Sequence, residues 1–333
     1  MTDTSSSPIA APCLDDLKAA RERIKGKAVL TPLLRFPVLD EVAGGTILVK
    51  PENLQRTGSF KFRGAFNALS QVPSADRPNG VVACSSGNHA QGIAESARLL
   101  GMPATIVMPE DAPIIKLERT RAMGAKVVTY DRAKEDRDAI AHKIQQDTGA
   151  IFVHPYNNPH VVAGQGTIGL ELAEQAAALE LKPDAVLACT GGGGLSAGVA
   201  LGISEGLPRA EFRTVEPDGF DDFKRSLETG HIQANKKVAG SICDAILTKC
   251  PGDMPFSILK QRASAGLVIS DDEALAAVAF AFRELKLIVE PGGVAALAAV
   301  LSGKIDCSNR IVSLVLSGGN IDTTVLNRAL DAR

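Results

Sequence analysis

The stretch AVLACTGGGGLSAG, residues 185–198, contains one complete strand-to-helix transition. Ala185–Cys189 is a short apolar run of strand length, and a pattern of helical period begins at Leu195. Four consecutive glycines stand between them, and glycine allows both a sharp turn and a close approach of a ligand to the backbone. The stretch therefore predicts a βα unit whose connecting loop binds a ligand.

The same alternation of short β-branched runs and longer helical patterns continues from about residue 80, as is typical of βα units around a mostly parallel sheet. The predicted strands are 81–84, 105–108, 126–130, 151–153, 185–189, 212–215, 267–269 and 311–316. The predicted helices are 88–100, 114–123, 134–146, 160–178, 195–204, 271–285, 294–301 and 323–332. We therefore expect an α/β protein with open, mostly parallel, twisted sheets.

The composition is that of an ordinary soluble globular protein, with 333 residues of which 45% are hydrophobic and 22% charged. This length suits two domains or one large domain. A net charge of −2 without a basic tail argues against a nucleic-acid partner, and no apolar run reaches the roughly 20 residues that cross a membrane. The six cysteines lack CxxC spacing and the N-terminus does not resemble a secretory signal, so we expect reduced thiols and a cytoplasmic location.

Three loops of small residues follow predicted strands: SSGN at 85–88, GGGG at 191–194 and SGGN at 317–320. In open α/β sheets, ligands bind in the crevice beyond the carboxyl ends of the strands. We therefore expect the three loops to surround one ligand.

The glycine loop suits a phosphate group, because successive free amides and a helix N-terminus attract an anion. A dinucleotide is an alternative ligand: Gly192, Gly194 and Ala197 match G-x-G-x-x-A, and Glu216 ends the next strand where a ribose-binding acid would stand. An NAD-dependent oxidoreductase is therefore an open alternative, although it leaves the other two loops unexplained.

The segment RTGSFKFRGAF, residues 56–66, predicts a helix that is capped by Ser59 and buries Phe62 and Phe66. Lys61 lies on a different stripe, whose other members are small and would leave space for a planar group: Gly64, Ala65 and Ala68. An apolar, enclosed setting lowers the pKa of a lysine and makes its amine nucleophilic. Most lysines are solvated, so the local pattern alone leaves both roles open.

Ser85, Ser86, Asn88 and His89 stand where a predicted strand gives way to a helix. Hydroxyls and backbone amides at a helix N-terminus suit a carboxylate. A capping turn around Asn88 is the alternative, because Ser and Asn are favoured at such turns.

Four segments in this order resemble the pyridoxal-phosphate enzymes of the tryptophan-synthase β-subunit-like fold type II: PENLQRTGSFKFRGAFNAL, CSSGNHAQG, TGGGGLSAG and VLSGGN. The similarity is strongest to the serine/threonine dehydratase and serine racemase family and extends from about residue 24 to residue 332. It implies a two-domain α/β fold. A small mobile domain, residues 80–157, would close over a large cofactor-binding domain formed by residues 1–79 and 158–333.

The resemblance also implies a role for each motif, with Lys61 attaching the cofactor and acting as the base at the substrate Cα. The residues that would hold the cofactor are Phe60, Lys61, Asn88, Gly191, Gly192, Gly193, Gly194, Leu195 and Ser317. The residues that would bind the substrate are Ser85, Ser86, Asn88, His89 and Arg137. In a racemase, Ser86 would exchange a proton on the face opposite Lys61.

Arg137 shares a helical stripe with Ile140, Ala141 and Ile144, which predicts that its side chain points toward the apolar side. By resemblance it would receive a second carboxylate, as in 3-hydroxyaspartate. A structural salt bridge is the alternative.

The family resemblance further implies a divalent-cation site formed by Glu216, the carbonyl of Phe220 and Asp222. Hard oxygen ligands of this kind suit Mg²⁺, with Ca²⁺ or Mn²⁺ as alternatives. From the residues alone, a solvated acidic turn is the simpler interpretation.

The implied function is β-elimination of a β-hydroxy amino acid, first of all L-threonine or L-serine, to a 2-oxo acid and ammonia. A 3-hydroxyaspartate dehydratase and a serine or aspartate racemase are alternatives within the family. An NAD-dependent oxidoreductase and a non-catalytic metabolite-binding protein are alternatives of other classes. A homodimer is expected from the resemblance alone.

Overall fold

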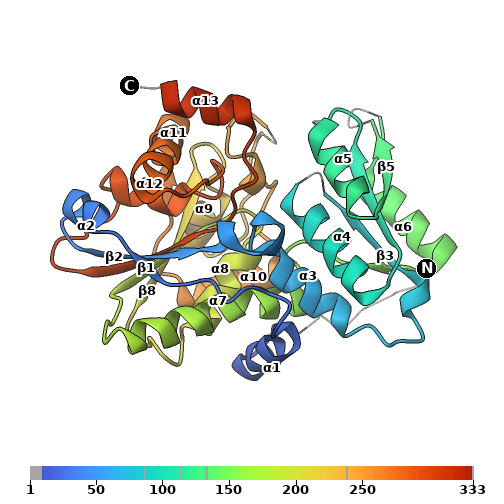
Figure 1. Cartoon of the computed structure of the whole chain (residues 1–333), viewed down its shortest axis with the longest axis horizontal. Helices are drawn as coiled ribbons and strands as arrows, with labels where there is room; N and C mark the ends of the chain where they lie inside the picture. The colour runs from blue at the N-terminus through green and yellow to red at the C-terminus, as the bar shows by residue number, and fades with distance from the viewer. Residues whose placement is uncertain (1–9, 86, 113, 132–133, 238, 332–333) are drawn as a thin grey trace.

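The computed structural model describes residues 10–85, 87–112, 114–131, 134–237 and 239–331. It contains two β-sheets that lie side by side, each flanked by helices (Figure 1). The larger sheet has six strands in the order β1-β2-β10-β7-β8-β9: Leu34–Arg35, Thr46–Pro51, Ile311–Leu316, Ala185–Cys189, Glu211–Pro217 and Leu267–Ile269. Its pairings are parallel except for that of β1 with β2. The expected α/β architecture with mostly parallel sheets is confirmed.

The smaller sheet has four parallel strands in the order β5-β4-β3-β6: Lys126–Tyr130, Ala104–Pro109, Val81–Cys84 and Ile151–Phe152. Side chains alternate between the two faces of a strand, and both faces of this sheet are covered. Val81 and Ala83 of β3 pack in the core that contains α4 (Asn88–Leu100), and Val82 packs in the core that contains α6 (Arg137–Thr148). Burial on both faces explains why β3 is apolar throughout.

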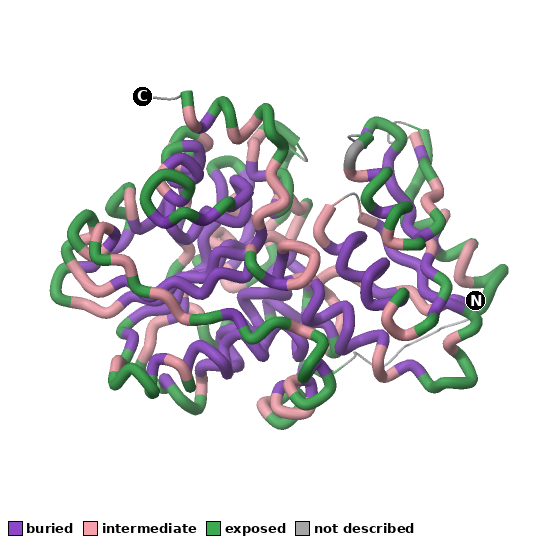
Figure 2. Tube along the Cα trace, viewed as in Figure 1, coloured by how far each residue is buried: buried purple, intermediate pink, exposed green. Residues whose placement is uncertain are grey.

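Helices also cover both faces of the larger sheet (Figure 1). On one side lie α7 (Pro159–Ala178), α8 (Gly194–Gly202) and α10 (Asp253–Arg262). On the other side lie α2 (Pro37–Ala43), α11 (Asp271–Phe280), α12 (Ala295–Leu301) and α13 (Thr323–Asp331). Three further helices are α1 (Leu14–Ile24), α5 (Ile114–Ala122) and α9 (Asp222–Thr229). Figure 2 shows that the strands and inward helix faces are buried, whereas the outer turns are exposed.

The helix α3 (Lys61–Ser70) links the two halves of the molecule. Its residues Ala65 and Leu69 pack in the core of the smaller sheet, together with Val161 of α7. The apolar core therefore crosses the boundary that was placed at residue 79, and the division into a large and a small mobile domain stays a prediction.

A buried ionic cluster anchors α3. Arg63 is fully buried and pairs with Glu52 (2.8 Å) and Glu171 (2.6 Å), and Lys50 pairs with Glu171 at 2.7 Å. Two positive and two negative side chains balance each other, whereas an unpaired charge at this depth would be strongly destabilising. The carboxylates of Glu52 and Glu171 raise the pKa of Arg63 against the effect of burial. The cluster fixes the first turn of α3, two residues from Lys61.

All predicted strands and helices are present, with ends shifted by up to three residues. The helix predicted over 271–285 is α-helical to Phe280 and continues as a π-helical segment, Ala281–Leu285. The sequence patterns did not predict β1, β2, α1, α2, α9 or α10. Within the described part of the chain, no helix is long and apolar enough to span a membrane.

Candidate active site

The three small-residue loops follow β3, β7 and β10, and the structure brings them together. The Nδ2 atom of Asn320 donates to Oδ1 of Asn88 (2.8 Å), which joins the third loop to the first. The glycine loop lies against Tyr156, since a Cβ atom at Gly192 would stand 2.3 Å from that ring. The expectation that these loops meet at one place is therefore consistent with the contacts.

The segment before Lys61 pairs with the loop after β10. Ser59 forms an antiparallel bridge with Gly318, and the amide of Phe60 donates to the carbonyl of Ser317 (3.0 Å). The prediction that Ser59 caps α3 is wrong: its backbone is extended, the N-cap is Phe60, and the Ser59 hydroxyl is buried without a partner. Pairing with a strand end replaces the cap and places Lys61 beside Ser317.

Lys61 is the first residue of α3, and its amine donates to the carbonyl of Pro155 (3.4 Å). The amine also lies 5.0 Å from the ring centre of Phe60. Burial lowers the pKa of Lys61 to about 8, and the nearby Cys189 and Glu290 act in the opposite direction. A lysine with this pKa is partly neutral, and thus nucleophilic, near physiological pH.

The sequence pattern suggested that the small residues on the stripe of Lys61 leave space for a planar group. In the structure they do not. A Cβ atom at Gly64 would lie 2.5 Å from the side chain of Gln165, and one at Gly164 would lie 2.6 Å from Cα of Gly64. These glycines instead allow α3 and α7 to approach closely.

The glycine loop is built as an anion site. The amides of residues 191–196 donate to no acceptor within the described residues, and α8 begins at Gly194. Gly193 has φ +89°, and a Cβ atom there would lie 2.3 Å from the ring of Phe223. Consecutive free amides at a helix N-terminus bind phosphate groups.

Asn88 is the first residue of α4, and both ends of its side-chain amide are occupied. Its Oδ1 accepts from Asn320, which also donates to the carbonyl of Thr57 (2.9 Å). Its Nδ2 donates to Oε1 of Glu290 at 2.5 Å. The amide orientation is thereby fixed, with the NH₂ group on the side of Glu290.

Glu290 is a site residue that the sequence patterns missed. It is 5% exposed, and burial raises its pKa to about 7. The sequence signal was an acid in the apolar run LIVEPGGV, where a carboxylate has no place unless it is bonded. Its contact with Asn88 and its influence on Lys61 place it between the first and third loops.

The first loop contains the predicted carboxylate site. The hydroxyl of Ser85 accepts from the amide of Gly87 (3.2 Å), and Ser86 lies outside the described residues. The amides of Asn88 and His89 donate to no acceptor in the described part of the chain. The His89 side chain is committed elsewhere, because its ring is buried and Nε2 donates to a backbone carbonyl (3.1 Å). Its backbone amide is therefore the group that can face a substrate.

Arg137 does not point toward the apolar side. Its side chain is 56% exposed, and its Nε atom lies 3.7 Å from Oδ1 of Asp138. The inward prediction is wrong because Asp136 caps α6 and places Arg137 in the first, exposed turn. The Arg137 charge nevertheless acts to lower the pKa of His154 and of Tyr156, so it lies near the site.

Glu216 and Asp222 both lie in the predicted cation site. Glu216 is buried and accepts from the amides of Phe223 and Lys224, at 2.8 Å each. In Asp222, Oδ1 accepts from Asn235 (2.6 Å) and Oδ2 is buried without a partner. These contacts argue against the dinucleotide alternative. Both carboxylate oxygens of Glu216 are bonded to amides at the start of α9, so they are not free to accept from a ribose hydroxyl.

The surroundings of this carboxylate pair fit a cation. Burial raises the pKa of both acids, to about 6 for Asp222, and the Asp222 charge adds to the rise at Glu216. The carbonyl of Phe220 accepts no hydrogen bond within the described residues. Among the described residues, no three His, Cys, Asp or Glu side chains are placed to hold a metal ion together, so a cation here would depend on that carbonyl and on water.

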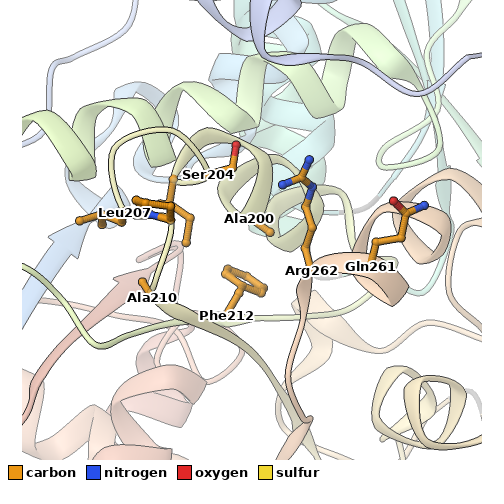
Figure 3. Close-up of a pocket in the computed structure, with 9 residues that line it drawn as sticks. Ala200, Ser204, Leu207, Ala210, Phe212, Gln261 and Arg262 are labelled. Carbon is orange, nitrogen blue, oxygen red and sulfur yellow. The ribbon is translucent and has the colours of Figure 1, made fainter.

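A cavity of about 230 Å³ lies elsewhere in the larger half (Figure 3). It lies between the C-terminal end of α8 and the beginning of β8, at the opposite end of α8 from the glycine loop. Ser204, Phe212 and Arg262 line it. None of the candidate site residues contributes to this cavity.

A family model described as pyridoxal-phosphate dependent enzyme matches residues 25–318. The chain belongs to this family. The match includes the motifs around Lys61, Asn88 and the glycine loop, and the fourth motif through Gly318. It excludes the oxidoreductase alternative in favour of a pyridoxal-phosphate enzyme.

Several characterised relatives are similar over most of their length. An L-threo-3-hydroxyaspartate ammonia-lyase of Pseudomonas sp. is 44% identical over 92% of this chain and 95% of that protein. The serine racemase of Schizosaccharomyces pombe is 41% identical, over 95% and 97%. The L-threonine ammonia-lyase of Thermotoga maritima is 40% identical, over 96% of this chain and 78% of that protein.

Solved structures agree with the fold type II assignment. A threonine deaminase from T.th. has a TM-score of 0.88 and 43% identity and covers 93% of this chain and 99% of that chain. Maize serine racemase has a TM-score of 0.90 and 32% identity, over 96% and 97%.

The residues of this pyridoxal-phosphate enzyme fit its cofactor. The free amides of the glycine loop match a phosphate, and the buried amine of Lys61 matches an aldehyde. Ser317 is buried just after β10, and its hydroxyl lies beside the thiol of Cys189. A hydroxyl at this place would suit the ring nitrogen of the cofactor. Phosphate, aldehyde and ring nitrogen thus each have a partner among the residues present.

The lowered pKa of Lys61 predicts the pH dependence of cofactor attachment. In the cofactor-free protein Lys61 has a pKa of about 8, so half of the amine is neutral and nucleophilic at that pH, whereas an ordinary lysine has a pKa of 10.5. We expect the rate of attachment, followed by the visible absorbance of the cofactor, to rise with a midpoint near pH 8 and to level off by about pH 9.5. Glu290→Gln removes a negative charge that raises this pKa, so the midpoint moves to lower pH. A rate that still increases at pH 10 would contradict the account.

Proposed function

We propose that the protein is an ammonia-lyase that removes the β-hydroxyl and the amino group of L-threonine and L-serine, giving a 2-oxo acid and ammonia. The observation that carries this proposal is the buried amine of Lys61, which has a lowered pKa and whose charge acts on His89, next to the free amides of the first loop. The named activities of the L-threonine ammonia-lyase and threonine deaminase relatives support it.

The groups of this chain divide the tasks of the proposed reaction. The amides of Asn88 and His89 bind and orient the substrate carboxylate. The neutral amine of Lys61 removes the proton from Cα. Bound pyridoxal phosphate supplies an electron sink for the Cα–H bond electrons. Closure of residues 80–157 over the site would exclude water during the elimination.

The placement of Arg137 favours substrates that lack a second carboxylate. An exposed guanidinium that is paired with Asp138 is not held in place to bind an anion at the site. 3-Hydroxyaspartate is the second candidate substrate. A 44% identical relative is an L-threo-3-hydroxyaspartate ammonia-lyase, and the Arg137 charge is near enough to lower the pKa of His154. Racemisation would require Ser86.

A panel of substrates tests the proposed function. We expect the cofactor-loaded protein to release 2-oxo acid from L-threonine and L-serine at least tenfold faster than from L-threo-3-hydroxyaspartate or D-serine. The release is measured by coupled reduction of the 2-oxo acid. Arg137→Ala leaves the threonine rate within twofold. Preference for hydroxyaspartate that is lost in Arg137→Ala would favour the second candidate, and D-serine formation without ammonia would favour a racemase.

We also propose that Glu216, the carbonyl of Phe220 and Asp222 bind a divalent cation, Mg²⁺ first of all. The buried Oδ2 atom of Asp222 and the unbonded carbonyl of Phe220 support this, because each lacks a partner that a cation would supply. The cation would hold the beginning of α9 against the end of β8. A homodimer is a further expectation that follows from the family.

Removal of the cation should destabilise the protein. A ligand present at about 100 times its Kd stabilises a fold by about 2.7 kcal/mol, so we expect exhaustive chelation to lower Tm by about 5 °C. Added Mg²⁺ should restore both Tm and the rate of 2-oxo acid release. Asp222→Asn serves as the matched control, because it should remove the response to chelation. If chelation changes neither Tm nor the rate, the proposal that these residues bind a cation is wrong.

A further inference from the structure

His154 is the one ring in the segment between β6 and α7 whose chain neighbours on both sides contact the site. Three contacts locate it: the Val153 carbonyl accepts from His89, the Pro155 carbonyl accepts from Lys61, and the Tyr156 ring lies on Gly192. His154 therefore stands between the first loop, the lysine and the glycine loop. The sequence patterns assigned it no role.

The tautomer of His154 is fixed by its own turn. Nδ1 accepts from the amide of Asn157 at 2.9 Å and faces the amide of Tyr156 at 3.4 Å. Because both partners are donors, Nδ1 carries a lone pair and the proton of the neutral ring is on Nε2. The ring is held edge-on to Tyr156, with centres 4.5 Å apart.

The Nε2–H group of His154 has no acceptor among the described residues, and it is not sealed in the core. His89 has no such free donor, because its Nε2–H group is bonded to the Val153 carbonyl. Its other ring nitrogen, Nδ1, is buried. Of these two rings, His154 has the available donor.

Burial keeps this donor neutral. It lowers the pKa of His154 to about 4, and the charges of Lys61 and Arg137 act in the same direction against that of Asp138. At physiological pH the ring therefore offers a hydrogen-bond donor without a positive charge. Such a donor suits a neutral oxygen better than a carboxylate, which an ionised arginine would bind more strongly.

We propose that His154 contacts the substrate and that its Nε2–H donates to the β-hydroxyl of the bound amino acid. This inference rests on the proposed function and adds the group that recognises the leaving hydroxyl. The contact would orient the β-carbon–oxygen bond relative to Lys61, and it would distinguish β-hydroxy amino acids from those without a β-oxygen.

Two substitutions separate this role from a structural one. His154→Asn keeps an acceptor near the position of Nδ1 and removes the Nε2 donor, whereas His154→Gln keeps a donor near the position of Nε2. Rapid mixing of the cofactor-loaded protein with L-serine or L-alanine gives an apparent Kd for each from the visible absorbance. L-Alanine has the same groups at Cα and no β-hydroxyl, so it reports any general damage.

We expect His154→Asn to weaken L-serine about 5- to 10-fold, the effect of one hydrogen bond, and to leave L-alanine within twofold. His154→Gln should keep the preference for L-serine over L-alanine. His231→Gln, at an exposed histidine of the larger half, is the control and should alter neither amino acid.

Equal weakening of both amino acids by His154→Asn, or no weakening of L-serine, would overturn the inference alone. Absence of any response of the unaltered protein to L-serine would overturn the proposed function together with it.

Discussion

The hydrogen bonds between the segment before Lys61 and the loop after β10 hold the site together. The amide of Phe60 donates to Ser317, and the amide of Gly319 donates to the carbonyl of Gly58 at 2.9 Å. These bonds fix the reactive lysine relative to the end of the larger sheet. Since a Cβ atom at Gly318 would lie 2.1 Å from Oε1 of Glu290, only glycine permits this approach.

Two basic side chains on α3, only two residues apart, have pKa values shifted in opposite directions. Arg63 is buried against two carboxylates, so it keeps its charge and serves as an anchor. Lys61 is enclosed near Glu290, which is itself bonded to Asn88, so burial prevails and the amine loses its proton near pH 8. The fold thus places a permanent charge and a titratable amine on one helix. The difference is due to the carboxylates that are paired with Arg63.

Much of the frame was predictable from the sequence because short apolar runs and glycine loops are local signals. β2 was missed because Lys50 and Pro51 end its apolar run after three residues, and the carboxylate that makes a buried Lys50 acceptable lies on α7. Ser59 and Arg137 were misplaced because helix periodicity does not reveal a strand-end pairing or an exposed first turn. Glu290 and His154 owe their roles to contacts with distant segments, which no local pattern contains.

The central claim is that the amine of Lys61 is the attachment point of the cofactor. Borohydride reduction of the cofactor-loaded protein, followed by peptide mapping, tests this most directly. The account predicts a single label on the peptide that contains Lys61. A label on another lysine, such as Lys116, which pairs with Asp244 at 3.0 Å, or no label at all, would contradict it.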